Sequence, residues 1–397
     1  MAGDQKRKSR KAVLDAIRES SGIARIDVAR NTGISQATVT TITAEMLRDG
    51  LIETVNTSGA NKDSARGRPR VDLKLRGNAH IVAGVKLANT TMSVVILDFE
   101  GNLLAEHAPT LEDSVYAPQA LADTLRGVLA DACALANIAL DDLSAVGLGM
   151  AGIVDAPRGF VYWSPSLNGR NVDLQPVLEK ELGVPFFIDN DANLVAMAEQ
   201  YFGEGRGVKD FLVVTVESGV GMGIVINNKL FRGTRGCGAE FGHTKVQLDG
   251  ALCRCGQRGC LEAYVADYAL LREASVASGR RQQITIPELL ESAREGDEMS
   301  KSIVTRASRM FAMGLANLAN IFDPELIILS GERMQMDHLY ANDVIDRIRE
   351  ATIQIDMPPP RVVIHKWGDL MWARGAAAFA IDAVADMAIE RLCEVAD

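Results

Sequence analysis

Long apolar runs and a secretory leader are both missing from this sequence. No apolar stretch reaches the length that spans a bilayer, and the basic N-terminus lacks the continuous apolar segment and small-residue cleavage site of a signal peptide. We therefore expect a cytoplasmic protein with no membrane contact. Its 397 residues exceed what one ordinary core accommodates, so at least two folding units are expected.

Cysteine is scarce, and its placement argues against a disulfide framework. Three of the six cysteines, Cys253, Cys255 and Cys260, fall within eight residues, a spacing that suits a metal better than disulfides in a long intracellular chain. Together with His243 they offer three thiolates and one imidazole. Such a set predicts a closed, tetrahedral zinc site of structural type, with no coordination position left for a substrate. Free, reduced cysteines are the alternative.

Positive charge is concentrated at the N-terminal end. Residues 1–80 carry 15 Lys and Arg against 9 Asp and Glu, a net charge of +6, whereas the whole chain has a net charge of −10. The remaining residues therefore have a net charge of −16. A small basic head on an acidic body indicates that the head binds a polyanion and the body binds something else.

The first 50 residues have the pattern of a helix-turn-helix. We expect helices at 9–20 and 26–31, a turn at Gly33, and a third helix with its N-cap at Ser35. The third helix would expose short and hydroxyl-bearing side chains: Gln36, Ala37, Thr38, Thr40, Thr41 and Thr43. Gln pairs with adenine, and Thr contacts a thymine methyl group or a phosphate. The predicted DNA contacts are Ser35, Gln36, Thr38, Thr40 and Thr41.

A basic segment lies between two predicted wing strands at 51–55 and 72–75. The run Arg66-Gly-Arg-Pro-Arg70 resembles an AT-hook, in which an extended Arg-Gly-Arg-Pro segment inserts arginines into a narrow minor groove. We therefore predict that Arg66, Arg68 and Arg70 contact DNA. A flexible basic loop is the alternative for this segment, and a helical dimerisation module without DNA contact is the alternative for the head.

From about residue 81 onward, short apolar runs that end in glycine or polar residues alternate with helical stretches. Helices are expected at 118–135, 192–202, 303–321 and 372–387. This alternation is typical of an α/β architecture, in which ligands bind at the ends of the strands.

Spaced glycine motifs in the body carry a family resemblance. The stretch Val216-Glu-Ser-Gly-Val-Gly-Met-Gly223 is followed by Gly233 and then by Ala239-Glu-Phe-Gly-His243. This pattern resembles the signature of the ROK family of repressors, open reading frames and kinases, and the head resembles the repressor branch of that family. The resemblance implies a winged helix-turn-helix followed by a two-lobed α/β body with the actin-like ATPase (ribonuclease H-like) fold.

The resemblance also implies domain limits. The winged helix-turn-helix would occupy residues 1–78 and the ROK body residues 79–397. Within the body, the first lobe would comprise about 79–187 plus the C-terminal helix, and the second lobe about 188–370.

For the body, the resemblance implies sugar binding next to zinc. The matching sugar-binding positions are Gly152, Asn190, Asp191, Glu240, His243 and Glu262. The aspartate that matches Asp191 is the general base in the kinases, so we expect it to be a vestigial base here. The resemblance also implies that zinc bound by one histidine and three cysteines lies beside the sugar pocket. His243 would then bind zinc through one ring nitrogen and sugar through the other.

The nucleotide positions depart from the kinase pattern. Lys86 replaces the aspartate that holds magnesium, and Ala88 and Asn89 add side chains where glycines admit phosphates. Glu217 replaces the leading glycine of the second phosphate turn, and Glu332 replaces the second glycine of the pair that contacts adenosine. These departures favour a sensor over a catalyst.

We therefore predict a transcriptional regulator without enzymatic activity, a repressor of carbohydrate-utilisation genes that binds operator DNA and a sugar or sugar phosphate. Because a two-fold operator requires paired heads, we expect a homodimer or a higher homo-oligomer. Two alternatives stay open. One is an active ATP-dependent sugar kinase with a DNA-binding head, and the other is a repressor controlled by protein contact.

Overall fold

The computed structural model describes residues 2–20, 22–56, 71–277, 284–331, 342–353, 356, 358–365, 368 and 370–394. The chain divides into two compact units: the first comprises Met1–Asn190 and Trp372–Asp397, and the second Asp191–Met371. The finer limits expected for the head and the two lobes stay predictions. Across the described ranges, no helix has both the length and the apolar character needed to cross a membrane.

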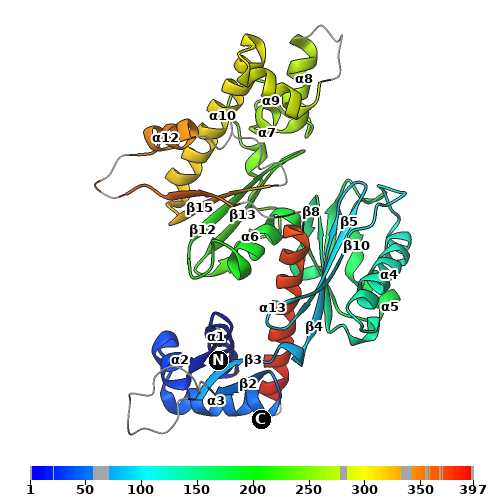
Figure 1. The fold of residues 1–397 in the computed structure, drawn as a ribbon, viewed down its shortest axis with the longest axis vertical. Helices are drawn as coiled ribbons and strands as arrows, with labels where there is room; N and C mark the ends of the chain where they lie inside the picture. Colours follow the sequence, from blue (N-terminus) through cyan, green and yellow to red (C-terminus); the bar gives the residue numbers. More distant parts are fainter. Residues whose placement is uncertain are drawn as a thin grey trace. The chain divides into compact units, whose positions relative to one another are not determined.

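The head contains the helices and wing strands of a winged helix-turn-helix (Figure 1). Its elements are α1 (Ala2–Arg18), β1 (Ile23–Ala24), α2 (Arg25–Thr32), α3 (Gln36–Arg48), β2 (Ile52–Asn56) and β3 (Val71–Leu75). The strands form an antiparallel sheet in the order β1-β3-β2. Gly33 ends α2 with a φ of 69°, a left-handed conformation that glycine adopts without strain. The expected turn and wing strands are both present.

A five-stranded mixed sheet forms the centre of the first unit. Its order is β11-β7-β4-β5-β6, with β7 parallel to β4 and β11, and β5 antiparallel to β4 and β6. Its strands are β4 (Ile81–Leu87), β5 (Met92–Asp98), β6 (Leu103–His107), β7 (Ala145–Met150) and β11 (Phe186–Asn190). The unit also contains α4 (Pro118–Leu135), β8 (Ile153–Asp155), β9 (Phe160–Trp163), β10 (Val172–Asp173), α5 (Leu174–Leu182) and nearly all of α13 (Met371–Glu394).

Helix α13 packs against this sheet at backbone contact distance. A Cβ atom added to Gly84 in β4 would lie 2.0 Å from the carbonyl oxygen of Ala373, and one added to Gly147 in β7 would lie 1.9 Å from that of Ala376. Both neighbours are backbone atoms, which cannot move aside as a flexible side chain can. Two glycines therefore let the helix approach the sheet this closely.

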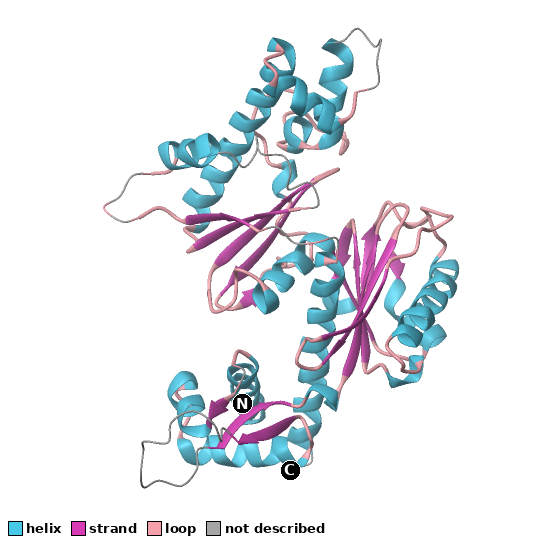
Figure 2. Cartoon of the chain, in the orientation of Figure 1, coloured by secondary structure: helices cyan, strands magenta, loops and turns pink. Residues whose placement is uncertain are grey.

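The second unit repeats the strand order of the first. Its sheet, β14-β13-β12-β15-β16, has three antiparallel strands followed by two parallel ones, as the first sheet has from β6 to β11. Both sheets are covered by helices (Figure 2). The strands are β12 (Phe211–Val216), β13 (Val220–Ile226), β14 (Lys229–Leu230), β15 (Leu326–Ser330) and β16 (Arg361–Ile364). The helices are α6 (Asp191–Phe202), α7 (Glu262–Val265), α8 (Asp267–Ala277), α9 (Ile286–Arg294), α10 (Glu298–Phe322) and α12 (Asn342–Ala351).

In the body, the long helices agree with the sequence-based expectation, and several shorter helices were not expected. The expected helices at 118–135, 192–202, 303–321 and 372–387 correspond to α4, α6, α10 and α13. Helices α5, α8, α9 and α12 were not expected. Each has 11 residues or fewer, so its apolar repeat is too short to stand out from the surrounding chain.

Candidate functional site

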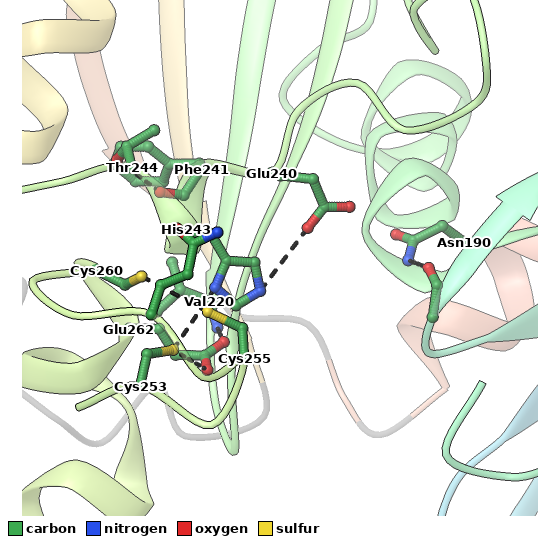
Figure 3. A network of polar contacts seen from close by, with 12 residues as sticks. Asn190, Val220, Glu240, Phe241, His243, Thr244, Cys253, Cys255, Cys260 and Glu262 are labelled. Atoms are coloured by element: carbon green, nitrogen blue, oxygen red, sulfur yellow. Dashed lines mark hydrogen bonds and ion pairs between the residues drawn. The ribbon is translucent and has the colours of Figure 1, made fainter. Parts of the chain in front are cut away.

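The four predicted metal ligands come together in the second unit (Figure 3). The donor atoms of His243, Cys253, Cys255 and Cys260 all lie within 4.8 Å of one another. His243 Nδ1 is 3.7 Å from Cys253 Sγ, and Cys255 Sγ is 3.8 Å from Cys260 Sγ. Ligands bound at about 2.3 Å around a tetrahedral zinc ion are about 3.8 Å apart, so this donor set fits such an ion.

The metal loop, residues 243–262, presents these ligands through tight backbone turns. Cys253 N–H donates to the carbonyl of Gln257 at 2.8 Å, and Gly256 N–H donates to that of Cys253 at 3.0 Å. Gly259 has a φ of 77°, and a Cβ atom there would lie 1.8 Å from the Gln247 carbonyl oxygen. The turn that brings the last cysteine back to the others therefore requires glycine.

An ammonium group adjoins the sulfur cluster. Lys245 Nζ donates to Cys260 Sγ at 3.1 Å, to Gln257 Oε1 at 2.6 Å and to the His243 carbonyl at 2.9 Å. Three thiolates and one divalent cation would leave a net charge of −1, which this lysine offsets. Burial raises the pKa of the Cys253 thiol, so metal binding must displace a proton there.

Two acidic side chains lie near His243. Its Nε2 lies 3.9 Å from Glu240 Oε2, and Glu262 Oε2 accepts a hydrogen bond from Val220 N–H at 3.4 Å. Burial raises the pKa of Glu240; His243 opposes this rise, and Glu262 and Asp191 add to it. Carboxylates and an imidazole arranged in this way offer acceptors for the hydroxyl groups of a sugar. Four predicted sugar-binding residues therefore influence one another within the second unit.

The other two predicted sugar-binding residues meet in the first unit. Asn190 Nδ2 donates to the carbonyl of Gly152 at 2.8 Å. Gly152 has a φ of 128°, and a Cβ atom there would lie 2.2 Å from the carbonyl oxygen of Trp163, so only glycine fits. Asn190 ends β11 and Asp191 begins α6, where its Oδ1 accepts a hydrogen bond from Ala192 N–H at 2.9 Å.

The predicted DNA-contacting residues are exposed at the start of α3. Ser35 caps the helix by accepting a hydrogen bond from Thr38 N–H at 3.2 Å. The Thr40 and Thr41 hydroxyls donate to the carbonyls of Gln36 and Ala37, at 2.8 and 3.2 Å. These threonines therefore present hydroxyl lone pairs and methyl groups to a ligand, while the exposed Gln36 amide offers both donors and an acceptor.

The expectation that Thr43 is exposed was wrong. It is fully buried, and its Oγ1 accepts a hydrogen bond from Arg25 Nε at 2.9 Å. Thr43 lies four residues after buried Val39 and therefore on the same face of α3. The predicted contacts Arg66, Arg68 and Arg70 lie outside the described residues.

The residues that depart from the kinase pattern have local roles in the fold. Lys86 is buried in β4, and its Nζ lies 3.5 Å from the centroid of the Trp372 ring at the start of α13. A cation over an indole face is attracted by the ring quadrupole. Ala88 N–H donates to the carbonyl of Thr91 at 3.0 Å, which closes the turn between β4 and β5. Glu332 lies outside the described residues.

A set of ion pairs that the sequence does not predict joins the head to the C-terminal helix. Lys11 Nζ lies 2.5 Å from Asp382 and 3.0 Å from Asp386, and Arg7 lies 3.0 Å from Glu390. The pKa of Lys11 is raised: burial is the largest single cause and opposes the rise, but the charges of Asp382, Asp15 and Asp386 together outweigh it. Because the partners stand at opposite ends of the chain, no local pattern could reveal this α1–α13 ion-pair cluster.

A tyrosine beside the metal loop was also missed. The Tyr268 hydroxyl lies 3.6 Å from Cys253 Sγ and 3.3 Å from Glu262 Oε1. Burial raises the pKa of this phenol, and the neighbouring Cys253 adds to the rise. The only signal in the sequence is its closeness to Glu262, which by itself indicates no contact.

Most of the chain matches profiles of known protein families. The profile described as the ROK family matches residues 82–383. The chain belongs to the ROK family. A second profile, that of a winged helix-turn-helix DNA-binding domain, matches residues 6–53.

Relatives of this ROK chain include repressors and kinases. It is 26% identical to the xylose repressor of Caldicellulosiruptor bescii over 383 residues, 93% of this chain and 94% of the relative. It is 34% identical to the glucokinase of Streptomyces coelicolor over 286 residues, 68% of this chain and 86% of the relative. A solved ROK family transcriptional regulator, a homologue of the Escherichia coli MLC protein, has a TM-score of 0.81 at 23% identity and covers 98% of this chain and 99% of its own. The predicted combination of a winged head with an actin-like ROK body is confirmed.

Proposed function

We propose that this ROK protein is a transcriptional repressor whose head binds operator DNA and whose body binds a sugar or sugar phosphate without phosphorylating it. The observation that carries the proposal is the match to a xylose repressor along 93% of the chain, with a DNA-binding profile on the head. A body that binds a ligand and a head that binds DNA are the two parts that a ligand-controlled repressor requires.

DNA binding rests on the exposed start of α3, with Ser35, Gln36, Thr38, Thr40 and Thr41, and on the basic segment with Arg66, Arg68 and Arg70. The double variant Arg66→Ala/Arg68→Ala should weaken operator binding and reduce its salt dependence. A protein that neutralises fewer phosphates releases fewer counterions from the DNA when it binds. A binding titration over a salt series measures this. Unchanged affinity and slope would remove the minor-groove role of the arginines.

Sugar binding rests on the acidic cluster beside His243. Within the second unit, hydrogen-bonding groups come from Asp191, Glu240, His243 and Glu262. The other two predicted sugar-binding residues, Gly152 and Asn190, belong to the first unit. A thermal-shift screen over monosaccharides and their phosphates, beginning with D-xylose and D-glucose, tests this because a bound ligand stabilises the folded state. If no sugar shifts the melting temperature, the effector is of another class, such as a partner protein.

Zinc is the metal that suits the donor set of the metal loop. His243, Cys253, Cys255 and Cys260 would hold it, and the metal would brace the loop and fix the tautomer of His243. With Nδ1 facing the thiols, Nε2 of that histidine is directed toward Glu240 and a sugar hydroxyl. Elemental analysis should find one zinc atom per chain.

An active sugar kinase is the second candidate, because the chain is 34% identical to a glucokinase over 68% of its length. Against it, magnesium-dependent phosphoryl transfer needs a carboxylate where Lys86 is placed against Trp372. Radiolabelled ATP and each sugar should yield no sugar phosphate, whereas Asp191→Ala should remove the effect of sugar on DNA binding, at a cost of about 1–3 kcal/mol of sugar-binding energy. Phosphorylation that disappears in Asp191→Ala would establish the kinase instead.

Reading a two-fold operator requires two heads, so the repressor should form a homodimer or a higher homo-oligomer. Light scattering of the purified chain gives its mass directly. A monomer that binds a single half-site with full affinity would contradict this part of the proposal.

A further inference from the structure

The carboxylate of Glu262 and the sulfur of Cys253 lie close together in the second unit. Cys253 Sγ is 3.5 Å from Glu262 Oε1. A free thiol can donate a hydrogen bond to the carboxylate at this distance. Both the sulfur and the carboxylate oxygen can also accept a hydrogen bond from a third group. A donor within reach of both atoms would hold them together.

The Tyr268 hydroxyl occupies the position that such a donor needs. Its oxygen is 3.3 Å from Glu262 Oε1 and 3.6 Å from Cys253 Sγ. A phenol is protonated at neutral pH and carries a single proton to donate. The hydroxyl also accepts a hydrogen bond from Arg254 N–H at 3.4 Å, which leaves its own proton for the carboxylate and the sulfur.

The ring of Tyr268 is held by two cations. The guanidinium carbon of Arg254 lies 4.0 Å from the ring centroid, and that of Arg272 lies 5.9 Å from it. Arg272 also donates to the carbonyls of Leu252 and Ala263, both at 2.9 Å. Arg272 therefore links the metal loop to α7, the helix that begins at Glu262, and also contacts the ring of Tyr268. These contacts restrict the orientation of the Tyr268 hydroxyl.

We propose that Tyr268 is a positioning residue that couples the metal cluster to the sugar-binding carboxylate, by sharing its hydroxyl proton between Cys253 Sγ and Glu262 Oε1. This inference rests on the proposed function for the role of Glu262 toward sugar, but its effect on metal binding is independent of sugar. Metal occupancy and the orientation of Glu262 are thereby linked through one proton.

The chain offers a matched control in Tyr264. Its hydroxyl accepts a hydrogen bond from Ala251 N–H at 2.7 Å, so it also supports the metal loop. Among the described residues, its hydroxyl makes no hydrogen bond to a sulfur or carboxylate atom. Tyr264→Phe therefore removes a hydroxyl that supports the loop backbone and leaves the Cys253–Glu262 contact unchanged.

The test measures cobalt(II) affinity of the full-length chain by competition with a chelator, following the thiolate-to-cobalt absorption band. Tyr268→Phe should weaken cobalt binding about tenfold or more and shift the band, as loss of a hydrogen bond to a metal ligand does. Tyr264→Phe should change the affinity less than about threefold and leave the band in place. Equal effects of the two variants would overturn the proposal.

A second variant tests whether Tyr268 acts through its hydroxyl hydrogen bond or only through the packing of its side chain. Glu262→Gln removes the negative charge and adds an amide donor near Cys253, so it should not weaken cobalt binding by itself. Combined with Tyr268→Phe, it should restore the affinity to within about threefold of the parent chain. Weaker binding in Glu262→Gln alone, or no rescue in the double variant, contradicts the proposal even if Tyr268→Phe folds poorly.

A sugar titration tests the proposed role of Tyr268 separately from the proposed binding of sugar. D-xylose and D-glucose are titrated into the cobalt-loaded parent chain and into the Tyr268→Phe variant. A sugar-induced change in the band that is lost in Tyr268→Phe supports the coupling. If the cobalt affinities change as expected but neither sugar changes the band, the role of Tyr268 between Cys253 and Glu262 is supported. The same result argues that neither sugar is the effector.

Discussion

The metal loop and the DNA-binding head are held in place by different chemistry. In the metal loop, Leu248 and Leu252 are 86% and 53% exposed, so burial of these apolar side chains contributes little there. Cys260 and Leu261, near the end of the loop, are fully buried in the core of the second unit, and the thiols, the imidazole and their polar neighbours position the exposed part of the loop. The head has an apolar core of its own, which includes the fully buried residues Val13, Leu14, Ile17, Val28 and Val39.

In these two regions, charged groups should contribute differently to the free energy of folding. A structural metal supplies folding free energy directly, because its site does not exist in the unfolded chain. Partly exposed ion pairs such as those between α1 and α13 contribute about 1 kcal/mol or less each, and salt screens them. We therefore expect the metal to decide whether its loop folds, and the ion pairs to decide how firmly the head is attached to α13.

Loss of a metal ligand should have the largest effect. Cys260→Ser should abolish metal binding and destabilise the second unit by several kcal/mol, since the buried serine hydroxyl is a poor ligand for zinc. Elemental analysis and thermal unfolding measure the two effects. Cys393→Ser, in α13, is the control and should retain the metal. A Cys260→Ser protein that is metal-free yet as stable as its parent would refute the metal dependence of the loop.

Breaking the buried ion pair between Arg10 and Glu45 in the head should have the next largest effect. Arg10 Nη2 lies 2.8 Å from Glu45 Oε2, with side chains 6% and 18% exposed. Glu45→Ala should destabilise the head by about 3 kcal/mol, because a buried guanidinium then loses its partner. Denaturant unfolding measures the loss. The exposed pair of Glu53 with Lys74 is the control, and Glu53→Ala should cost less than about 1 kcal/mol. Equal costs would show that burial of the pair is unimportant.

Disruption of the α1–α13 ion-pair cluster should have the smallest effect on stability. Lys11→Glu places a carboxylate beside Asp382 and Asp386 and should destabilise the attachment of the head by about 1 kcal/mol at low salt. Asp382→Lys in the same chain should restore part of this. Limited proteolysis and thermal unfolding at low and high salt measure the effect. A loss that high salt does not reduce would mean that packing, rather than charge, attaches the head.

Much of the fold follows from local sequence patterns. The alternation of apolar runs predicts most strands of both sheets but not the edge strands β6 and β14, and the spaced glycine motifs predict the ROK body. Thr43 shows where such reasoning fails. Its hydroxyl suggested an exposed position, but the repeat of α3 places it with Val39 against Arg25 of α2. A polar side chain is buried where a partner is available, and the partner comes from another helix.

The candidate site divides in the same way. The ligands of the metal loop could be predicted because they are close together in the chain and because few chemical roles suit one histidine and three cysteines. The role proposed for Tyr268 could not, because tyrosine is common beside buried helices. Its significance depends on the short helix α8, which was not expected, and on which atoms its hydroxyl meets.

The sequence by itself determined the family, the order of the domains and the group of one histidine and three cysteines that could hold a metal, since these depend on residue types and on spacings that the covalent chain preserves. Only the tertiary structure decided that Lys11 meets Asp382, 371 positions away, and that a tyrosine hydroxyl joins a thiol to a carboxylate. The physical reason is that electrostatic and hydrogen-bond energies depend on distances of a few ångströms, which packing determines and linear spacing does not.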